Sequence, residues 1–257
     1  PTVDLFFADA DGEYLVPVSR TVSRSESDPA SLVGDLLAGP QDGLGLVNPI
    51  PDGTIVRSLS FEDGRLVLDL GGTYGGEAGS LAHEAVLQSV QSWPGVDTAI
   101  VTADGRPLDT NSSGHLLYFY DEERDMLLAR PVGLVSPADV LAAYLDGPSE
   151  SALAGLPDDI AALGIELESN GLLRLEFTYR PSLRRYALDH PDSVRRVLEG
   201  LIATFTTGFS QVEGVYLDFE GRNALGAGQC ANMLNTAQLR PEVLNDERLL
   251  ARRASEA

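Results

Sequence analysis

The sequence contains no lysine, a single cysteine and no long apolar segment. All 18 basic residues are therefore arginines, which by itself says nothing about chemistry. Cys230 has no second thiol with which to form an internal disulfide or a thiolate pair for a metal. No run approaches the roughly 18 apolar residues that a membrane-spanning helix requires. These absences exclude disulfide-stapled folds, cysteine–zinc folds and helical membrane spans within this sequence.

Positive charge is also scarce, because 39 acidic residues outnumber the 18 arginines and give a formal net charge of −21. Phosphate backbones and anionic lipid repel such a chain, so we expect neither nucleic-acid binding nor membrane-surface binding. The acidity does not indicate disorder, since 43% hydrophobic and 22% charged residues are typical of folded proteins. The length of 257 residues fits one or two domains.

The chain carries the same sequence pattern twice. Four motifs recur in the same order, at an offset that stays between 106 and 116 residues. Their two occurrences are Leu5–Val16 and Leu117–Leu128, Asp28–Pro40 and Ser136–Pro148, Gly64–Leu70 and Gly171–Phe177, and Val96–Arg106 and Val212–Arg222. One match could arise by chance, but four in register indicate a domain of about 105 residues used twice.

Each copy predicts the element order ββαββαβ. A hairpin comes first, followed by a helix with Asp28 or Ser136 as its N-cap, a proline at the next position and a Gly-Pro stop. A second hairpin then turns at a glycine. The next helix is clearest in the second copy, where Val194–Phe205 places six apolar residues on one face. A final strand, 98–102 or 215–219, closes each copy.

This order predicts an α+β fold in which each copy is a small mixed sheet with two helices on one face. We expect the first domain at 1–107, a linker at 108–114 and the second domain at 115–222. Residues 223–257 are expected to form a C-terminal tail with a short helix at Pro241–Arg253.

No pattern selects a catalytic, cofactor or metal site. His83-Glu84 resembles the beginning of a zinc-protease helix, but Leu87 stands where the second histidine ligand is required. None of the three histidines has a ligand partner at metal-binding spacing, so we expect them to be solvated or locally bonded. Gly226–Ala231 fits a dinucleotide fingerprint loosely, yet it lacks the strand–helix unit that such a site needs. We therefore expect no catalytic residue, no cofactor and no metal.

Acidic residues offer two weaker alternatives. Asp9, Asp11 and Glu13 alternate like calcium ligands, but no bidentate glutamate follows at the right distance. An acidic hairpin turn is the favoured interpretation, and weak calcium binding stays open. Paired carboxylates for glycoside cleavage also stay open, because nothing among the 39 acids selects one pair.

One local cluster stands against the overall charge. Five of the 18 arginines lie within 17 residues of the second copy, interleaved with tyrosines. Guanidinium groups bind carboxylates bidentately and tyrosines offer contact area at low entropic cost, so the cluster is a candidate partner-binding patch. In the alternative, these arginines neutralise acids of their own domain. The patch comprises Tyr179, Arg180, Arg184, Arg185, Tyr186, Arg195 and Arg196.

Several runs of the first copy resemble a known domain. These runs are Phe6-Phe7, Tyr14-Leu15-Val16-Pro17, Asp28–Pro40, Ile50-Pro51-Asp52-Gly53-Thr54, Gly64–Leu70 and Trp93–Arg106. In series they are similar to the GerMN domain of sporulation and spore-germination proteins. The second copy resembles it more loosely, because it keeps Gly147-Pro148 but lacks the glycine after Pro157-Asp158.

The resemblance implies an extracytoplasmic, often lipid-anchored protein from a family without established catalytic residues. We therefore expect a non-enzymatic cell-envelope protein that contacts other envelope or sporulation proteins, or itself, in sporulation or germination. A binding module for a glycan or germinant, and a cell-wall hydrolase with inter-domain carboxylates, stay open as alternatives. The sequence begins at Pro1 without an initiator methionine, so we expect any export signal or lipid-anchor cysteine to have preceded it.

Overall fold

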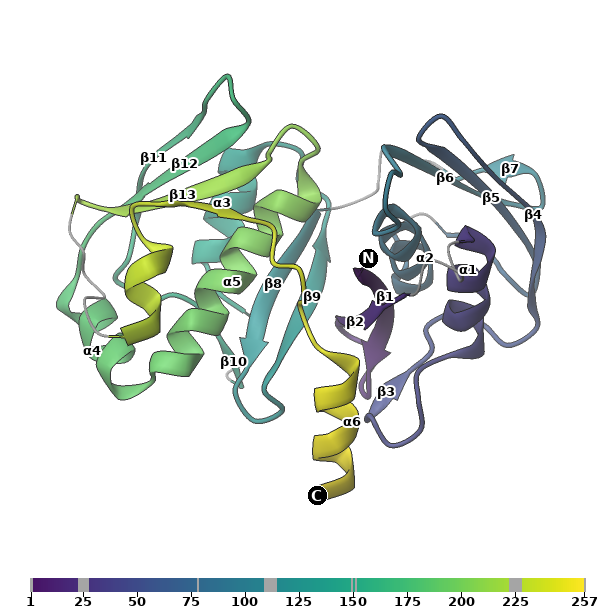
Figure 1. Ribbon diagram of the computed structural model, residues 1–257, viewed down its shortest axis with the longest axis horizontal. Coiled ribbons are helices and arrows are strands. Elements are labelled where there is room, and N and C mark those ends of the chain that lie inside the picture. Colours follow the sequence, from purple (N-terminus) through teal and green to yellow (C-terminus); the bar gives the residue numbers. More distant parts are fainter. Residues whose placement is uncertain are drawn as a thin grey trace. The chain divides into compact units, whose positions relative to one another are not determined.

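The computed structural model describes residues 2–22, 28–77, 79–108, 115–148, 150, 152–221 and 228–256 (Figure 1). The chain divides into two compact units, of which unit 1 comprises Pro1–Gly114 and Glu242–Ala257 and unit 2 comprises His115–Pro241. Residues 223–257, predicted as one tail, instead divide between the units. The last segment belongs to unit 1 because Asn245 and Glu247 form hydrogen bonds with Pro17 and Arg20.

Unit 1 contains a hairpin sheet and a mixed sheet. Strands β1 (Thr2–Asp9) and β2 (Leu15–Thr21) are antiparallel, and the short β3 (Leu46–Val47) pairs with the end of β1. In the mixed sheet, ordered β4-β5-β6-β7, only β5 and β6 run parallel. The remaining elements are β4 Thr54–Glu62, β5 Arg65–Gly72, β6 Thr98–Ala103, β7 Arg106–Pro107, α1 Pro29–Ala38, α2 Leu81–Gln91 and α6 Glu247–Glu256.

Unit 2 repeats this plan. Strands β8 (His115–Asp121) and β9 (Met126–Val132) form an antiparallel hairpin, and β10 (Leu153–Ala154) pairs with β8. The mixed sheet is ordered β11-β12-β13-β14, with β12 and β13 parallel. The remaining elements are β11 Ala162–Leu167, β12 Leu172–Phe177, β13 Gly214–Phe219, β14 Ala237–Leu239, α3 Pro137–Leu145, α4 Pro181–Asp189, α5 Pro191–Gly208 and the 3-10 helix η3 Gly228–Met233.

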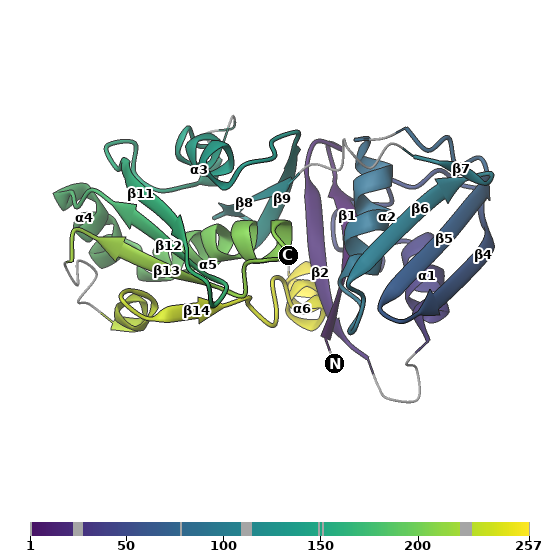
Figure 2. The same ribbon diagram turned by 90° about the horizontal axis from the view of Figure 1, so that it is seen from above.

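The fold class is confirmed, because each unit is an α+β arrangement of helices on sheets in the predicted order. The single mixed sheet expected in each copy is instead divided into the hairpin sheet and the mixed sheet. In unit 1 the reason is helix α2, which packs against both β1 and β6 (Figure 2). At this edge of β1, hydroxyls of α2 and its C-cap take the place of another strand: the amide of Phe6 donates to Ser89 Oγ on α2 at 2.9 Å, and the amide of Asp4 donates to Ser92 Oγ at the C-cap at 3.0 Å.

The same helix-to-strand contact occurs in unit 2. The amide of Tyr118 on β8 donates to Thr204 Oγ1 of α5 at 3.1 Å. The Thr204 hydroxyl in turn donates to the carbonyl of Gly200 at 2.9 Å, as Ser89 donates to Ala85 at 2.7 Å in unit 1. A Cβ on Gly200 would lie only 2.6 Å from the carbonyl oxygen of Tyr118. Glycine at this position therefore permits the close approach of α5 to β8.

Helices α1, α2 and α3 begin at residues whose side chains cap them. No described helix is long and apolar enough to cross a membrane. The Asp28 side chain accepts the amide of Ala30 at 2.9 Å, and Ser136 Oγ accepts that of Asp139 at 3.1 Å. A proline occupies the first turn of both α1 and α3. These starts confirm the predicted N-caps.

Candidate functional site

Helix α4 places part of the predicted arginine cluster on the surface of unit 2. Pro181 begins the helix, and Leu183 and Ala187, one turn apart, are buried. Arg184, Arg185 and Leu188 are consequently exposed, since they occupy other faces of the helix. Between β5 and α2 of unit 1, the described residues form no corresponding helix. The α4 segment is therefore an addition to the second copy.

Three arginines on α4 and at its N-cap have no acidic partner within ion-pair distance among the described residues. Arg184 and Arg185 are exposed, and Arg180 uses Nη1 for a hydrogen bond to its neighbour, the carbonyl of Tyr179, at 3.1 Å. Leu188 lies beside them with 54% of its surface exposed. We name Arg180, Arg184, Arg185 and Leu188 the arginine face.

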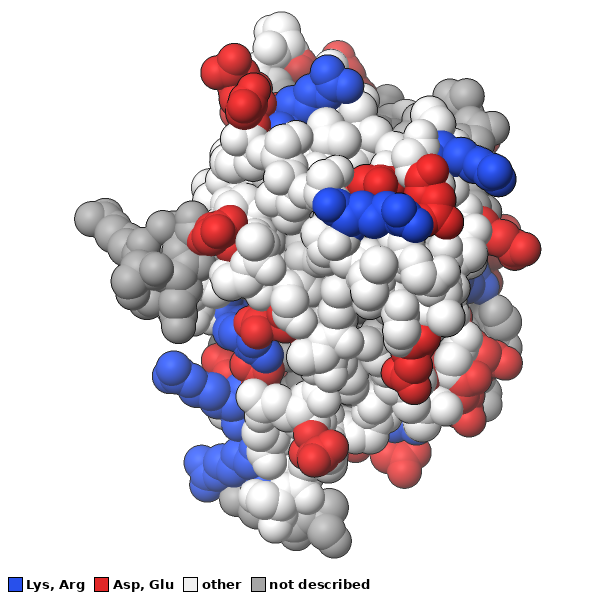
Figure 3. All heavy atoms as spheres, turned by 90° about the vertical axis from the view of Figure 1, so that its right-hand side faces the viewer, with Lys and Arg blue, Asp and Glu red and all other residues white. Residues whose placement is uncertain are grey.

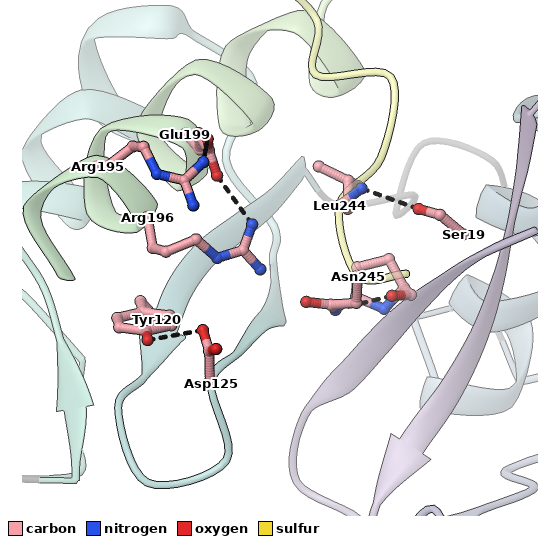
Figure 4. A network of polar contacts seen from close by, with 9 residues as sticks. Ser19, Tyr120, Asp125, Arg195, Arg196, Glu199, Leu244 and Asn245 are labelled. Carbon is pink, nitrogen blue, oxygen red and sulfur yellow. Dashed lines mark hydrogen bonds and ion pairs between the residues drawn. The ribbon is translucent and has the colours of Figure 1, made fainter. Parts of the chain in front are cut away.

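Arg195 and Arg196 behave differently, because both bind an acid of their own helix. Their Nη1 atoms lie 2.6 and 2.8 Å from the two carboxylate oxygens of Glu199 on α5 (Figure 4). The Arg196 guanidinium also lies 5.8 Å from the ring centre of Tyr120, whose hydroxyl donates to Asp125 at 2.8 Å. This part of the predicted patch therefore matches the alternative of neutralisation within the domain.

The two tyrosines of the predicted patch also contact their own unit. The Tyr186 hydroxyl donates to Glu122 Oε1 at 3.2 Å, and its ring lies 5.7 Å from that of His190. Burial, with the added effect of the Glu122 carboxylate, raises the pKa of Tyr186. The backbone amide of Tyr179 donates to Glu220 at 3.0 Å, and its side chain is half-buried. Of the seven predicted residues, the structure thus exposes Arg180, Arg184 and Arg185.

Leu188 and the helical form of the segment were not predicted from the sequence. Pro181 followed by Leu183 and Ala187 is a helix-start signal with an i, i+4 apolar pair, so the information was present. Exposure of Leu188 could not be read from this pattern, because it depends on which face packs against α5.

The histidine–glutamate pair of unit 1 is buried in α2 and is not solvated. His83 is 1% exposed and its Nδ1 lies 3.4 Å from the hydroxyl of Tyr74. Burial lowers the pKa of His83, so the imidazole is held neutral. Among the described residues, no group of three or more His, Cys, Asp or Glu side chains is arranged to hold a metal ion. His83 is thus a buried, locally bonded side chain.

In each acidic hairpin turn, the first carboxylate accepts hydrogen bonds from backbone amides that follow it. Asp9 Oδ1 accepts the amides of Glu13 and Tyr14, each at 2.9 Å. In unit 2, Asp121 Oδ1 accepts the amides of Glu123 and Arg124 at 2.9 and 3.0 Å. The repeated acidic turn therefore has a structural role in both hairpins.

The loose dinucleotide pattern falls partly outside the described residues, since 226 and 227 belong to an undescribed stretch. Its remaining residues lie in the 3-10 helix η3. Cys230 there is buried, with Sγ 3.5 Å from the carbonyl oxygen of Pro191. Burial raises the pKa of this thiol, so it is held protonated at neutral pH.

The mixed sheet of unit 1 presents a mainly uncharged surface, seen from the β4 and β7 side in Figure 3. Ser58 and Ser60 on β4 are exposed, and Ile100 on β6 is half-buried. Asp69 is engaged there, because Thr102 Oγ1 and the Gly105 amide donate to it at 2.6 and 2.8 Å. These two hydrogen bonds lower the pKa of Asp69.

The family named Germane, described as sporulation and spore germination, matches residues 4–109 and 116–225. No curated protein matches the sequence. The structure is similar to the tandem GerMN domains of the sporulation protein GerM from Bacillus subtilis, with a TM-score of 0.63 and 16% identity over 96% of this chain and 99% of that one. The first GerMN domain of the same protein gives a TM-score of 0.34 and 20% identity over 42% of this chain and 86% of that one. Because the family matches both units and the GerM likeness spans them, this chain belongs to the sporulation and spore germination family and is a tandem GerMN-domain protein.

Proposed function

We propose that this chain is a non-enzymatic cell-envelope protein that makes protein–protein contacts in sporulation or spore germination, and that the arginine face is one contact surface. Membership of the sporulation and germination family supports the process. The GerMN resemblance supports a place outside the cytoplasm, held by a lipid anchor. The single observation that carries the contact surface is the grouping of Arg180, Arg184 and Arg185 on α4 and at its N-cap, with no acidic partner among the described residues.

The arginine face is distinguished by its grouping: three arginines without an acidic partner among the described residues lie together on α4 and at its N-cap. With 39 acidic residues available, a surface arginine readily finds a carboxylate, as Arg195 and Arg196 do with Glu199. Arg180, Arg184 and Arg185 nevertheless stay unpaired among the described residues. Guanidinium groups beside an exposed leucine suit a partner surface that offers carboxylates around an apolar contact.

The test compares two double variants with equal changes of net charge. Arg184→Glu with Arg185→Glu reverses the arginine face, whereas Arg65→Glu with Arg106→Glu reverses two exposed arginines of unit 1 that have no ion pair with any described residue. Each tagged chain is recovered from the envelope of sporulating cells, and the affinity for any co-purified protein is then measured with purified components. We expect the first variant to bind at least about tenfold more weakly, and the control to match the wild type.

Equal affinity of the two double variants would remove the arginine face from the proposal. A separate assay addresses the non-enzymatic part. Purified chain incubated with spore cortex should release no soluble muropeptides. Release that disappears on Asp or Glu substitution would replace the proposal with a wall hydrolase.

A further inference from the structure

The C-terminal segment, residues 242–257, is held to unit 1 by a specific set of hydrogen bonds (Figure 4). The amide of Ser19 on β2 donates to the carbonyl of Asn245 at 2.7 Å, and the Leu244 amide donates to Ser19 Oγ at 2.9 Å. Asn245 Nδ2 donates to the carbonyl of Pro17 at 2.8 Å. Ser19 and Asp246 also form a parallel β-bridge. The segment therefore binds β2 as a short added strand.

Side chains give this contact its selectivity. Arg20 binds Glu247 bidentately, with Nε 2.8 Å from Oε2 and Nη2 2.6 Å from Oε1. Glu247 is 9% exposed and Asn245 is 3% exposed, so both are desolvated in the docked state. Ser19 is oriented by Asp4, whose Oδ1 accepts its hydroxyl at 2.6 Å. Backbone pairing supplies affinity in such a strand addition, and buried side chains supply specificity.

The segment reaches this site only through the chain that follows unit 2. The other part of unit 1 ends at Gly114, and the segment begins at Glu242. Glu242 and Val243, at its start, are exposed and lie in no helix or strand. The docked contact is therefore non-covalent, and its strength within one chain comes partly from tethering.

We propose that residues 242–257 are an exchangeable docking segment, and that a second copy of this chain supplies it in a reciprocal, segment-swapped dimer. A second copy carries the same Leu244, Asn245 and Glu247, so the bonds to β2 and Arg20 are identical in trans. Exchange of an identical element between two copies forms a closed pair without any new interface. The proposal goes beyond the proposed function and uses a different surface from the arginine face.

Two full-length charge reversals test the exchange. In Arg20→Glu the site repels its own Glu247, and in Glu247→Arg the segment repels its own Arg20. When the two variants are mixed, each site meets the complementary segment only in trans. We expect equimolar mixing to give a species of two chains by light scattering and native mass spectrometry, while each variant alone stays mainly monomeric.

The double variant R20E/E247R is the matched control, because it restores the opposite charges both within one chain and between copies and should therefore match the wild type in oligomeric state. A mixture that contains only monomers, while the double variant is folded, would overturn the proposal.

If a single charge reversal fails to fold, full-length Glu247→Ala serves as receptor for fluorescent peptides of residues 242–257. The natural peptide should bind at least about tenfold more tightly than its Glu247→Ala counterpart, because only the former completes the Arg20 pair. Equal binding of both peptides, or none, would overturn the proposal.

Discussion

Substitution of Ser89 by alanine removes the hydroxyl through which α2 bonds the edge of β1. The amide of Phe6, 2.9 Å from Ser89 Oγ, loses that acceptor in a site where Ser89 is completely buried. An unsatisfied buried amide costs about 1–3 kcal/mol. Alanine recovers roughly 0.5 kcal/mol through its higher helix propensity. We therefore expect the free energy of unfolding of unit 1 to fall by about 0.5–2.5 kcal/mol.

The single tryptophan makes this change measurable in unit 1 alone. Trp93 is 6% exposed, so its fluorescence reports the unfolding of the unit that contains β1 and α2. With a urea dependence of about 2 kcal/mol per M, the midpoint should fall by roughly 0.3–1.2 M at unchanged slope.

Ser92→Ala is the matched control for Ser89→Ala. Ser92 Oγ also accepts a β1 amide, that of Asp4 at 3.0 Å, but Ser92 is only half-buried. Water can replace this acceptor, so the midpoint should fall by less than half as much. A loss from Ser92→Ala equal to or larger than that from Ser89→Ala would refute the argument from burial.

Two further predictions concern packing and pH. Gly200→Ala should destabilise unit 2 by about 1–3 kcal/mol because its Cβ meets the Tyr118 carbonyl, whereas Gly34→Ala, with no atom within 4 Å of its Cβ, should stabilise unit 1 by about 0.5–1 kcal/mol. Thermal unfolding of both variants checks the opposite signs, and a Gly200→Ala protein as stable as the wild type would contradict the close approach. The lowered pKa of His83 implies stability that is fully present above the ordinary histidine pKa of about 6.5 and is lost as pH falls through the folded value. The Trp93 urea midpoint should therefore fall more between pH 7.5 and pH 5 in the wild type than in His83→Gln; equal falls would exclude this contribution.

Local chemistry explains which parts of the fold could be predicted. Asp28 and Ser136 precede prolines and cap the helices that follow, and these signals lie within a few residues. Short periodic patterns likewise predicted the hairpins and the long apolar face of α5. Division of the strands into two sheets was not, because it depends on Ser89 meeting Phe6 across 83 residues.

The candidate site was predictable in composition but not in geometry. The arginine cluster was visible in the sequence, yet only the fold separates Arg184 and Arg185 from Arg195 and Arg196. The last two share Glu199 on the same helix, a pairing that their spacing of three and four residues allowed. Glu247 and Arg20 lie 227 residues apart in the sequence, so no local pattern predicts their contact.

The discontinuity of unit 1 sets the order in which the two units can be completed. A chain emerging N-terminus first, from a ribosome or through a secretion channel, presents Thr2–Pro107 long before Glu247. Once Pro241 has emerged, unit 2 has all its strands and helices, whereas unit 1 still lacks residues 242–257, which bind β2. The first unit to be synthesised is therefore the last to be finished, and a nascent chain stalled before its C-terminus holds one complete unit and one unfinished unit.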